Sequence, residues 1–248
     1  MNKSNENFLI VQNAIDMTRD EALRVLCAED ETIKPLAFLN IDEIKNEDEA
    51  DLILFHLTNH PNPVREACAY CLSEIQGRGF INKEEHFRIL TDAICDINPN
   101  VCRMIIRLLV CDKRLVERIM PQNIERIQKL LEDFKIYEKE FGAYKGNKLR
   151  NRKNHAKNKK LFNLYWCLEA LGETLDKNCP YEGEILNICR SGAYFLDYTI
   201  REKTAKILVK IPRAPKELLQ KLKNDENFYV KNQVYDKICK DSSYRDTL

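Results

Sequence analysis

The chain has 248 residues, of which 44% are hydrophobic and 32% charged, and its formal net charge is +1. This composition excludes a disordered protein, and only 7 glycines and 8 prolines argue against a fold of many strands and tight turns. No apolar segment approaches the ~20 residues that span a bilayer, and the N-terminus does not resemble a secretory signal. We therefore predict a soluble, cytoplasmic, helical protein without membrane contacts, and we interpret its ten cysteines as reduced thiols.

Residues 1–46 form the first predicted segment. Thr18 and Glu21 have the spacing of a capping box, in which each side chain binds the backbone N–H of the other residue. Apolar residues follow at Ala22 and Leu23 and again at Val25 and Leu26. We predict two or three helices here that form an N-terminal helical cap.

Residues 47–240 contain a repeated pattern. Four stretches begin with Asn or Asp, which can accept hydrogen bonds from the first turn of a helix, and an apolar residue follows two or three positions later. Further apolar residues come at spacings of three and four, which is typical of an amphipathic helix. A fifth copy is predicted at residues 160–171. The polar starts are Asn62, Asn98, Asp197 and Asn227, and the apolar positions are Val64, Val101, Ile200 and Val230.

Another amphipathic stretch precedes each of these helices, so the predicted unit is an A helix, a short turn and a B helix. The interval between the second and third copies is longer, which predicts a basic insertion near residues 142–158. Residues 241–248 are predicted to be a C-terminal tail. The A helices are expected at 47–58, 83–96, 121–141, 181–190 and 214–223, and the B helices at 63–75, 99–114, 157–173, 198–210 and 228–240.

The stretch from Asp197 to Arg201, DYTIR, resembles the D-x-x-V-R signature that opens the second helix of HEAT repeats. The stretch from Asn227 to Lys231 is similar, whereas Cys102 stands where the family has arginine and the first copy is one residue short. The resemblance implies an all-α, armadillo-like α-solenoid of about five HEAT-like helix pairs, with A helices on the convex side and B helices on the concave side. It also implies a binding protein, mostly for proteins and in some cases for nucleic acids.

One histidine and cysteine pattern suggests a metal site. His56 and His60 are four residues apart and Cys68 and Cys71 three apart, so each pair shares one face of a helix. The B-helix pattern, however, places small residues where the cysteines stand, and a free cysteine packs as a small hydrophobic residue. We favour this packing interpretation and predict no metal and no cofactor. Motifs of nucleophilic catalysis and of phosphate-binding loops are also missing, so we predict that the chain is not an enzyme.

Eight cations and no acidic residue occur between positions 145 and 160, which predicts a solvated basic loop that could neutralise phosphates. Two other interpretations are that the loop stays in water or that it pairs with the acidic first 60 residues. The candidate residues of this basic loop are Lys145, Lys148, Arg150, Arg152, Lys153, Lys157, Lys159 and Lys160.

The predicted B helices carry 15 Lys and Arg against 7 Asp and Glu, whereas the A helices carry 10 against 16. If the B helices line the concave side, as the resemblance implies, that side should be positive and attract anionic partners. Some of these cations are also explained by their place at helix C-termini, where positive charge is favourable. The candidate residues of the concave face are Arg65, Arg103, Arg107, Arg201, Lys206, Lys210 and Lys231.

These patterns favour a non-enzymatic HEAT-repeat scaffold whose basic concave face holds a protein or an acidic peptide. The alternative is a nucleic-acid-binding HEAT-like protein that uses the same face together with the basic loop. A HEAT-like DNA glycosylase is a special case of that alternative, with Trp166 as the only tryptophan. The sequence therefore predicts the architecture in more detail than the partner.

Overall fold

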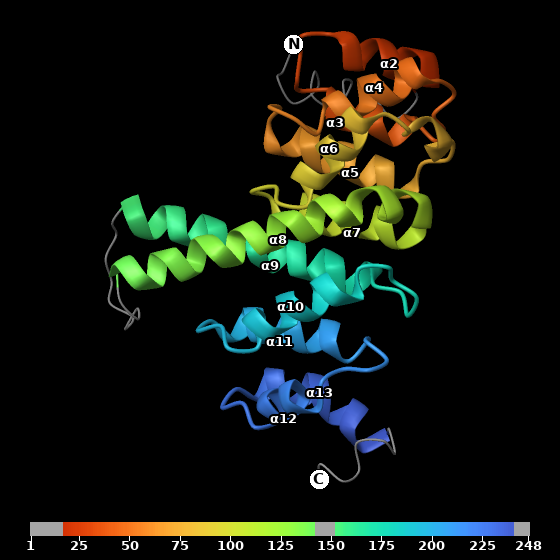
Figure 1. Ribbon diagram of the computed structural model, residues 1–248. Coiled ribbons are helices and arrows are strands. Elements are labelled where there is room, and N and C mark those ends of the chain that lie inside the picture. Colours follow the sequence, from red (N-terminus) through yellow and green to blue (C-terminus); the bar gives the residue numbers. More distant parts are fainter. Residues whose placement is uncertain (1–16, 142–151, 241–248) are drawn as a thin grey trace. The chain divides into compact units, whose positions relative to one another are not determined.

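The computed structural model describes residues 17–141 and 152–240. Over these residues the chain is helical, and its only β pairing is one isolated bridge between Glu43 and Gln76. Within the same ranges, every helix is too short or too polar to cross a membrane. Figure 1 follows the helices from the red N-terminal part to the blue C-terminal part. The chain divides into two compact units, Met1–Ile119 (unit 1) and Met120–Leu248 (unit 2).

Unit 1 contains the predicted cap and the first two helix pairs. The cap consists of α2 (Arg19–Cys27), α3 (Lys34–Ala37) and the short 3-10 helix η1 (Phe38–Asn40). The helix pairs are α4 (Glu47–Phe55) with α5 (Asn62–Glu74), and α6 (Glu84–Ala93) with α7 (Pro99–Cys111), and a second 3-10 helix, η2 (Arg78–Phe80), lies between them.

Three further helix pairs follow in the described residues, and nearly all of their length belongs to unit 2. The boundary between the two units, after Ile119, falls inside the first helix of the first of these pairs. The pairs are α8 (Lys113–Phe141) with α9 (Arg152–Thr174), α10 (Glu182–Gly192) with α11 (Tyr198–Leu208), and α12 (Lys216–Lys223) with α13 (Phe228–Lys240).

The predicted helix starts are confirmed at most positions. Thr18 and Glu21 form the capping box, with the Thr18 N–H donating to the Glu21 carboxylate at 2.8 Å. Asn98 and Asp197 each accept a hydrogen bond from the backbone two residues later, at 2.9 Å. The prediction at Asn62 is wrong by one residue, because the helix begins at Asn62 itself and its N-cap is Pro61. The extended backbone at Pro61 ends the preceding turn and so fixes this start.

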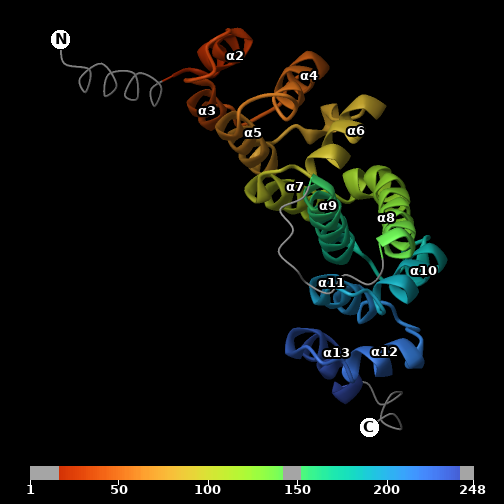
Figure 2. The same ribbon diagram turned by 90° about the vertical axis from the view of Figure 1, so that its left-hand side faces the viewer.

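The B helices pack closely on one another within each unit. In unit 1, α5 packs on α7, and in unit 2, α9 packs on α11 and α11 on α13. Figure 2 shows α5 and α7 on one side of unit 1 with α4 and α6 on the other, and within unit 2 it separates α9, α11 and α13 from α8, α10 and α12. Each unit is therefore a stack of helix pairs, which is the all-α, α-solenoid class that the sequence predicts.

The chain is helical from Arg152, so the B helix predicted at 157–173 begins five residues earlier, and the predicted loop is wrong over the part that this helix occupies. The extra length between the second and third copies lies largely in α8, with 29 residues, and α9, with 23. The segment that follows Gly146 contains no further glycine and no proline before Gly172, so nothing in it breaks a helix. Lys145, Lys148 and Arg150 lie outside the described residues.

Candidate functional site

Arg65 of α5 binds the next helix pair rather than facing outward. Its Nε and Nη2 atoms donate to the two carboxylate oxygens of Asp96, at 2.7 and 3.0 Å, and its Nη1 donates to the carbonyl of His60. Asp96 lies in the turn between α6 and α7 and also accepts from the Asn98 N–H at 2.7 Å. The side chains of Arg65 and Asp96 are only 12% and 10% exposed. This arginine therefore joins neighbouring helix pairs.

Arg201 of α11 repeats this arrangement in unit 2. It donates to both carboxylate oxygens of Asp225, at 2.7 and 3.0 Å, and to the carbonyls of Phe195 and Leu196, at 2.9 and 2.8 Å. Burial alone would raise the pKa of Asp225, but the hydrogen bonds from Arg201 and Asn227 outweigh it and hold that pKa below its ordinary value. Two of the seven predicted concave-face cations thus have a structural role that the sequence did not reveal.

The remaining candidates in unit 1 are exposed. Arg107 of α7 forms an ion pair with Glu74 of α5 at 2.7 Å, with the two side chains 55% and 46% exposed. Arg103, one turn earlier, is exposed and donates to the side chain of Asn100 at 2.9 Å. Tyr70 of α5 is 47% exposed on the neighbouring helix. Exposed arginines and an exposed tyrosine thus lie on α7 and α5, two B helices of unit 1 that pack on each other and are joined by the Arg107–Glu74 ion pair.

The candidates in unit 2 lie close to acidic residues. Lys206 Nζ lies between Glu169 and Glu173 of α9, at 3.1 and 2.7 Å, and the Lys210 Nζ donates to the carbonyl of Glu173 at 3.4 Å. Lys203 Nζ also pairs with Glu169 at 3.1 Å. Lys231 is exposed on α13. Acidic residues of α9, itself a B helix, therefore neutralise part of the positive charge of the B helices in unit 2.

The described members of the predicted basic loop lie on α9. The backbone of Arg152 and Lys153 forms its first turn. Lys157 is half-buried, Lys159 is exposed, and the Lys160 Nζ forms an ion pair with Asp133 of α8 at 2.6 Å. These cations are thus spaced along one helix instead of along a loop.

The two histidines of the suggested metal site have other contacts. His56 is fully buried, and its ring nitrogens face the carbonyls of Leu52 and Leu26, at 2.8 and 3.1 Å. Burial lowers the pKa of His56. The His60 ring stacks on it with centroids 4.6 Å apart, and its Nδ1 faces the Glu31 carboxylate at 3.0 Å. These contacts fix both histidine rings against the protein.

The two cysteines pack as the second interpretation proposes. The thiols of Cys68 and Cys71 donate to the carbonyls of Ile53 and Ile41, at 3.1 and 3.5 Å. No group of three or more His, Cys, Asp or Glu residues is placed to hold a metal ion in the described part of the chain. The contacts therefore favour helix packing as the role of both residues.

Burial raises the pKa of the Cys68 thiol well above its usual range and that of Cys71 to about 12. Since the thiolate is the reactive form, we expect iodoacetamide at about pH 8 to alkylate exposed Cys27 and Cys111 in the folded protein and Cys68 and Cys71 only after denaturation. Peptide mass spectrometry after timed labelling measures this difference. Equal labelling rates for Cys68 and Cys111 in the folded protein would contradict the packing.

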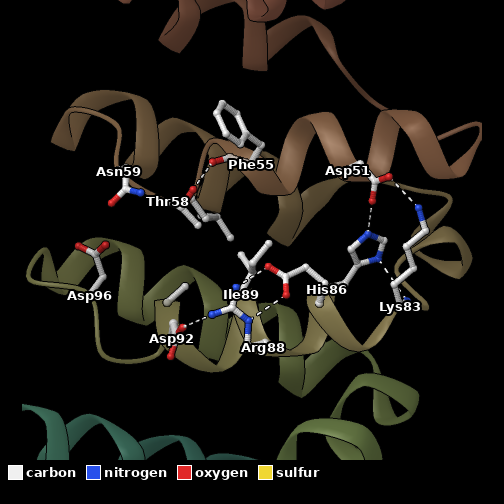
Figure 3. A pocket seen from close by; sticks show the side chains of 13 residues that line it. Asp51, Phe55, Thr58, Asn59, Lys83, His86, Arg88, Ile89, Asp92 and Asp96 are labelled. Atoms are coloured by element: carbon white, nitrogen blue, oxygen red, sulfur yellow. Dashed lines mark hydrogen bonds and ion pairs between the residues drawn. The ribbon is translucent and has the colours of Figure 1, made fainter.

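A groove of about 800 Å³ lies between the A helices α4 and α6 of unit 1. Figure 3 shows Phe55 and Asp51 on one wall, and His86, Arg88 and Asp92 on the other. The sequence reasoning did not find this groove, because its volume depends on the separation of two helices. The only signal was the excess of acids on the A helices.

The end of the groove nearest the start of α6 is held by a buried histidine. His86 is 1% exposed, and its Nδ1 accepts from the Asn82 N–H at 3.2 Å. That contact leaves the proton on Nε2, which donates to Asp51 at 2.5 Å. Lys83 Nζ binds the other Asp51 oxygen at 2.7 Å. Hydrogen bonds from Lys83 and His86 hold the pKa of Asp51 below its ordinary value, so its carboxylate is ionised at neutral pH.

Comparison with known proteins adds structural likeness only. No protein-family model and no curated protein matches the chain. A designed armadillo repeat protein is 11% identical with a TM-score of 0.45, over 88% of this chain and 97% of that one. Another, solved in complex with the peptide (KR)4, is 10% identical with a TM-score of 0.42, over 88% and 96%. An engineered protein is 13% identical with a TM-score of 0.41, over 90% and 96%. Likeness at this level bears on no ligand or partner.

Proposed function

We propose that the chain is a non-enzymatic, HEAT-like repeat scaffold that holds a protein or an acidic peptide on its B helices. The observation that carries this proposal is the surface formed by Tyr70 of α5 with Arg103 and Arg107 of α7, which we name the B surface. Tyrosine and arginine are the residue types that most often dominate protein interfaces, and all three side chains are exposed. Their helices pack closely on each other, so the side chains rest on a rigid support.

The charge of the B surface suits an acidic partner. The ion pair of Arg107 with Glu74 is about half exposed on both sides, and such pairs contribute only about 0–1 kcal/mol. A carboxylate of a partner can therefore replace Glu74 at little cost. Arg65, by contrast, is held by the nearly buried Asp96 and is excluded from the surface.

Binding of a fluorescein-labelled peptide of alternating Glu and Leu, measured by fluorescence anisotropy at low salt, tests this proposal. We expect the double variant Arg103→Gln, Arg107→Gln to bind about tenfold more weakly, which corresponds to about 1.4 kcal/mol. The matched control is Arg24→Gln with Lys45→Gln, which removes two exposed cations of unit 1 outside the B surface. Equal losses in the two double variants would contradict a local site.

The nucleic-acid alternative makes a different prediction for the same assay. A random single-stranded DNA that binds more tightly than the acidic peptide, with an affinity that falls steeply as salt rises, would support it and contradict the scaffold proposal. In that case, replacement of Lys148, Arg150, Arg152 and Lys153 by Gln should weaken DNA binding. The scaffold proposal requires that those four changes leave binding of the acidic peptide unchanged.

A further inference from the structure

The centre of the groove between α4 and α6 presents an exposed aromatic side chain. Phe55 is 58% exposed, although phenylalanine is usually buried, and Ile89 of α6 also lines the groove. The Phe55 ring meets the rings of His60 and His56 edge-on, with centroids 5.0 and 5.6 Å apart. Because buried His56 is itself fixed by two carbonyls, the exposed ring is supported from behind. Such support lowers the entropy cost of binding a ligand.

Acidic residues line the groove together with these apolar side chains. The two helices carry six exposed acids, and the cations that line the groove are Lys83, at the start of α6, and Arg88. The ion pair with Arg88 holds the pKa of Glu85 below its ordinary value, as Lys83 and His86 do for Asp51. The carboxylates of Glu85 and Asp51 are therefore ionised at neutral pH. The six acids are Glu47, Asp48, Asp51, Glu84, Glu85 and Asp92, of which Asp51, Glu85 and Asp92 line the groove.

Arg88 shows how the groove holds a guanidinium group. Its Nε and Nη2 atoms donate to the Glu85 carboxylate at 2.9 and 2.5 Å, and its Nη1 lies 3.9 Å from Asp92. Figure 3 shows Arg88 and Asp92 on the wall below Phe55, joined by a dashed line. The Arg88 side chain is 62% exposed, so its ion pairs are weak and can be exchanged. An arginine from another chain can take the same place between the two carboxylates.

We propose that this groove binds a short peptide segment of a protein partner in which an apolar side chain is flanked by Lys or Arg. The apolar side chain packs on Phe55 and Ile89, and the flanking cations pair with Glu85 and Asp92 on one side and with the acids near Asp51 on the other. This site lies on the A helices and prefers cations, so it is separate from the B surface, which suits an acidic partner. A scaffold with both sites joins partners of opposite charge.

Binding of a fluorescein-labelled peptide with the sequence GKRLLRKG, measured by fluorescence anisotropy, tests the site. We expect saturable binding, and we expect Phe55→Ser to weaken it at least about tenfold. The matched control is Ile97→Ser, because Ile97 is 77% exposed in the same unit but does not line the groove. Circular dichroism of both variants shows whether they remain folded. A folded Phe55→Ser protein with unchanged affinity overturns the proposal.

The Arg88→Gln variant tests the same site by a gain of binding. Removal of this internal competitor leaves the Glu85 carboxylate for the ligand, so we expect the affinity for GKRLLRKG to rise about threefold or more, and to fall in the variant Glu85→Gln. The exposed control is Glu29→Gln, outside the groove. Equal or weaker binding by Arg88→Gln, or equal binding of the acidic peptide GEDLLDEG at this groove, overturns the proposal.

Hydrogen exchange separates this site from the B surface. With GKRLLRKG bound, we expect slower amide exchange in α4 and α6 and unchanged exchange in α5 and α7. Protection confined to α5 and α7 overturns the groove proposal. Failure of the acidic peptide to bind the B surface would contradict the proposed function and leave the groove result standing, so the two proposals fail by different observations.

Discussion

Replacing Arg201 by Ala is expected to lower the free energy of unfolding of unit 2 by about 3–5 kcal/mol. The change leaves the carboxylate of Asp225, which is only 2% exposed, without its guanidinium partner. It also removes the donor for the carbonyls of Phe195 and Leu196. Urea unfolding followed by tryptophan fluorescence measures the effect, because the single tryptophan, Trp166, is 6% exposed and lies in unit 2.

Two further variants separate the lost ion pair from other effects. In the double variant Arg201→Met, Asp225→Leu no charge is left buried, so it should lose less stability than Arg201→Ala. The control Lys160→Gln breaks an ion pair of unit 2 in which the lysine is 49% exposed, and it should cost at most about 1 kcal/mol. If Arg201→Ala costs no more than Lys160→Gln, the buried pair does not hold the helix pairs together.

The sequence did not predict the two ion pairs that join neighbouring helix pairs, Arg65 with Asp96 and Arg201 with Asp225. The sequence predicts that Arg65 and Arg201 follow the first apolar position of a B helix, and this is confirmed. Their partners lie 31 and 24 residues further along the chain, and a count of charges cannot show which of them meet. A signal was nevertheless present, since Asp96 and Asp225 each stand two residues before the Asn that starts the next B helix.

The copy that carries cysteine in place of arginine supports the same explanation. Cys102 stands at the position of Arg65 and Arg201, and its thiol donates to the carbonyl of Asp96 at 3.2 Å. It therefore binds the turn within its own helix pair, whereas each arginine reaches the next pair.

The helices could be predicted because the sequence signals for them are local. The groove could not be predicted from such signals. Polar helix starts and apolar residues at spacings of three and four act within one turn, so they predicted five A and five B helices. Most bounds are correct within a few residues, but α8 begins at Lys113 instead of 121, with Pro121 inside the helix, and α9 begins at Arg152 instead of 157. The groove depends on the distance between α4 and α6 and on the exposure of Phe55. The length of α9 was also missed. Its first residues are mostly Lys and Asn, and such a run indicates a loop unless apolar residues continue through it at helical spacing.

Gly77→Ala is expected to destabilise unit 1 by about 2–4 kcal/mol. Gly77 follows α5 with φ at +71°, a left-handed conformation that residues with a Cβ atom rarely adopt. A Cβ atom there would lie 2.0 Å from the backbone oxygen of Ile44, and a backbone atom cannot rotate away. The same Ile44 donates its N–H to the Gln76 carbonyl at 3.0 Å, so the clash falls on the segment that leads into α4.

The matched control for this prediction is Gly79→Ala, two residues further on. A Cβ atom at Gly79 meets no atom within 4 Å, so the change should alter the stability by less than about 0.5 kcal/mol. Urea unfolding followed by circular dichroism measures both variants, and hydrogen exchange in α4 and α5 places the loss in unit 1. Equal stabilities of the two variants would contradict the close approach of Gly77 to Ile44. A loss confined to Gly77→Ala would show that this approach fixes the backbone that precedes α4, and with it the wall of the groove that carries Asp51 and Phe55.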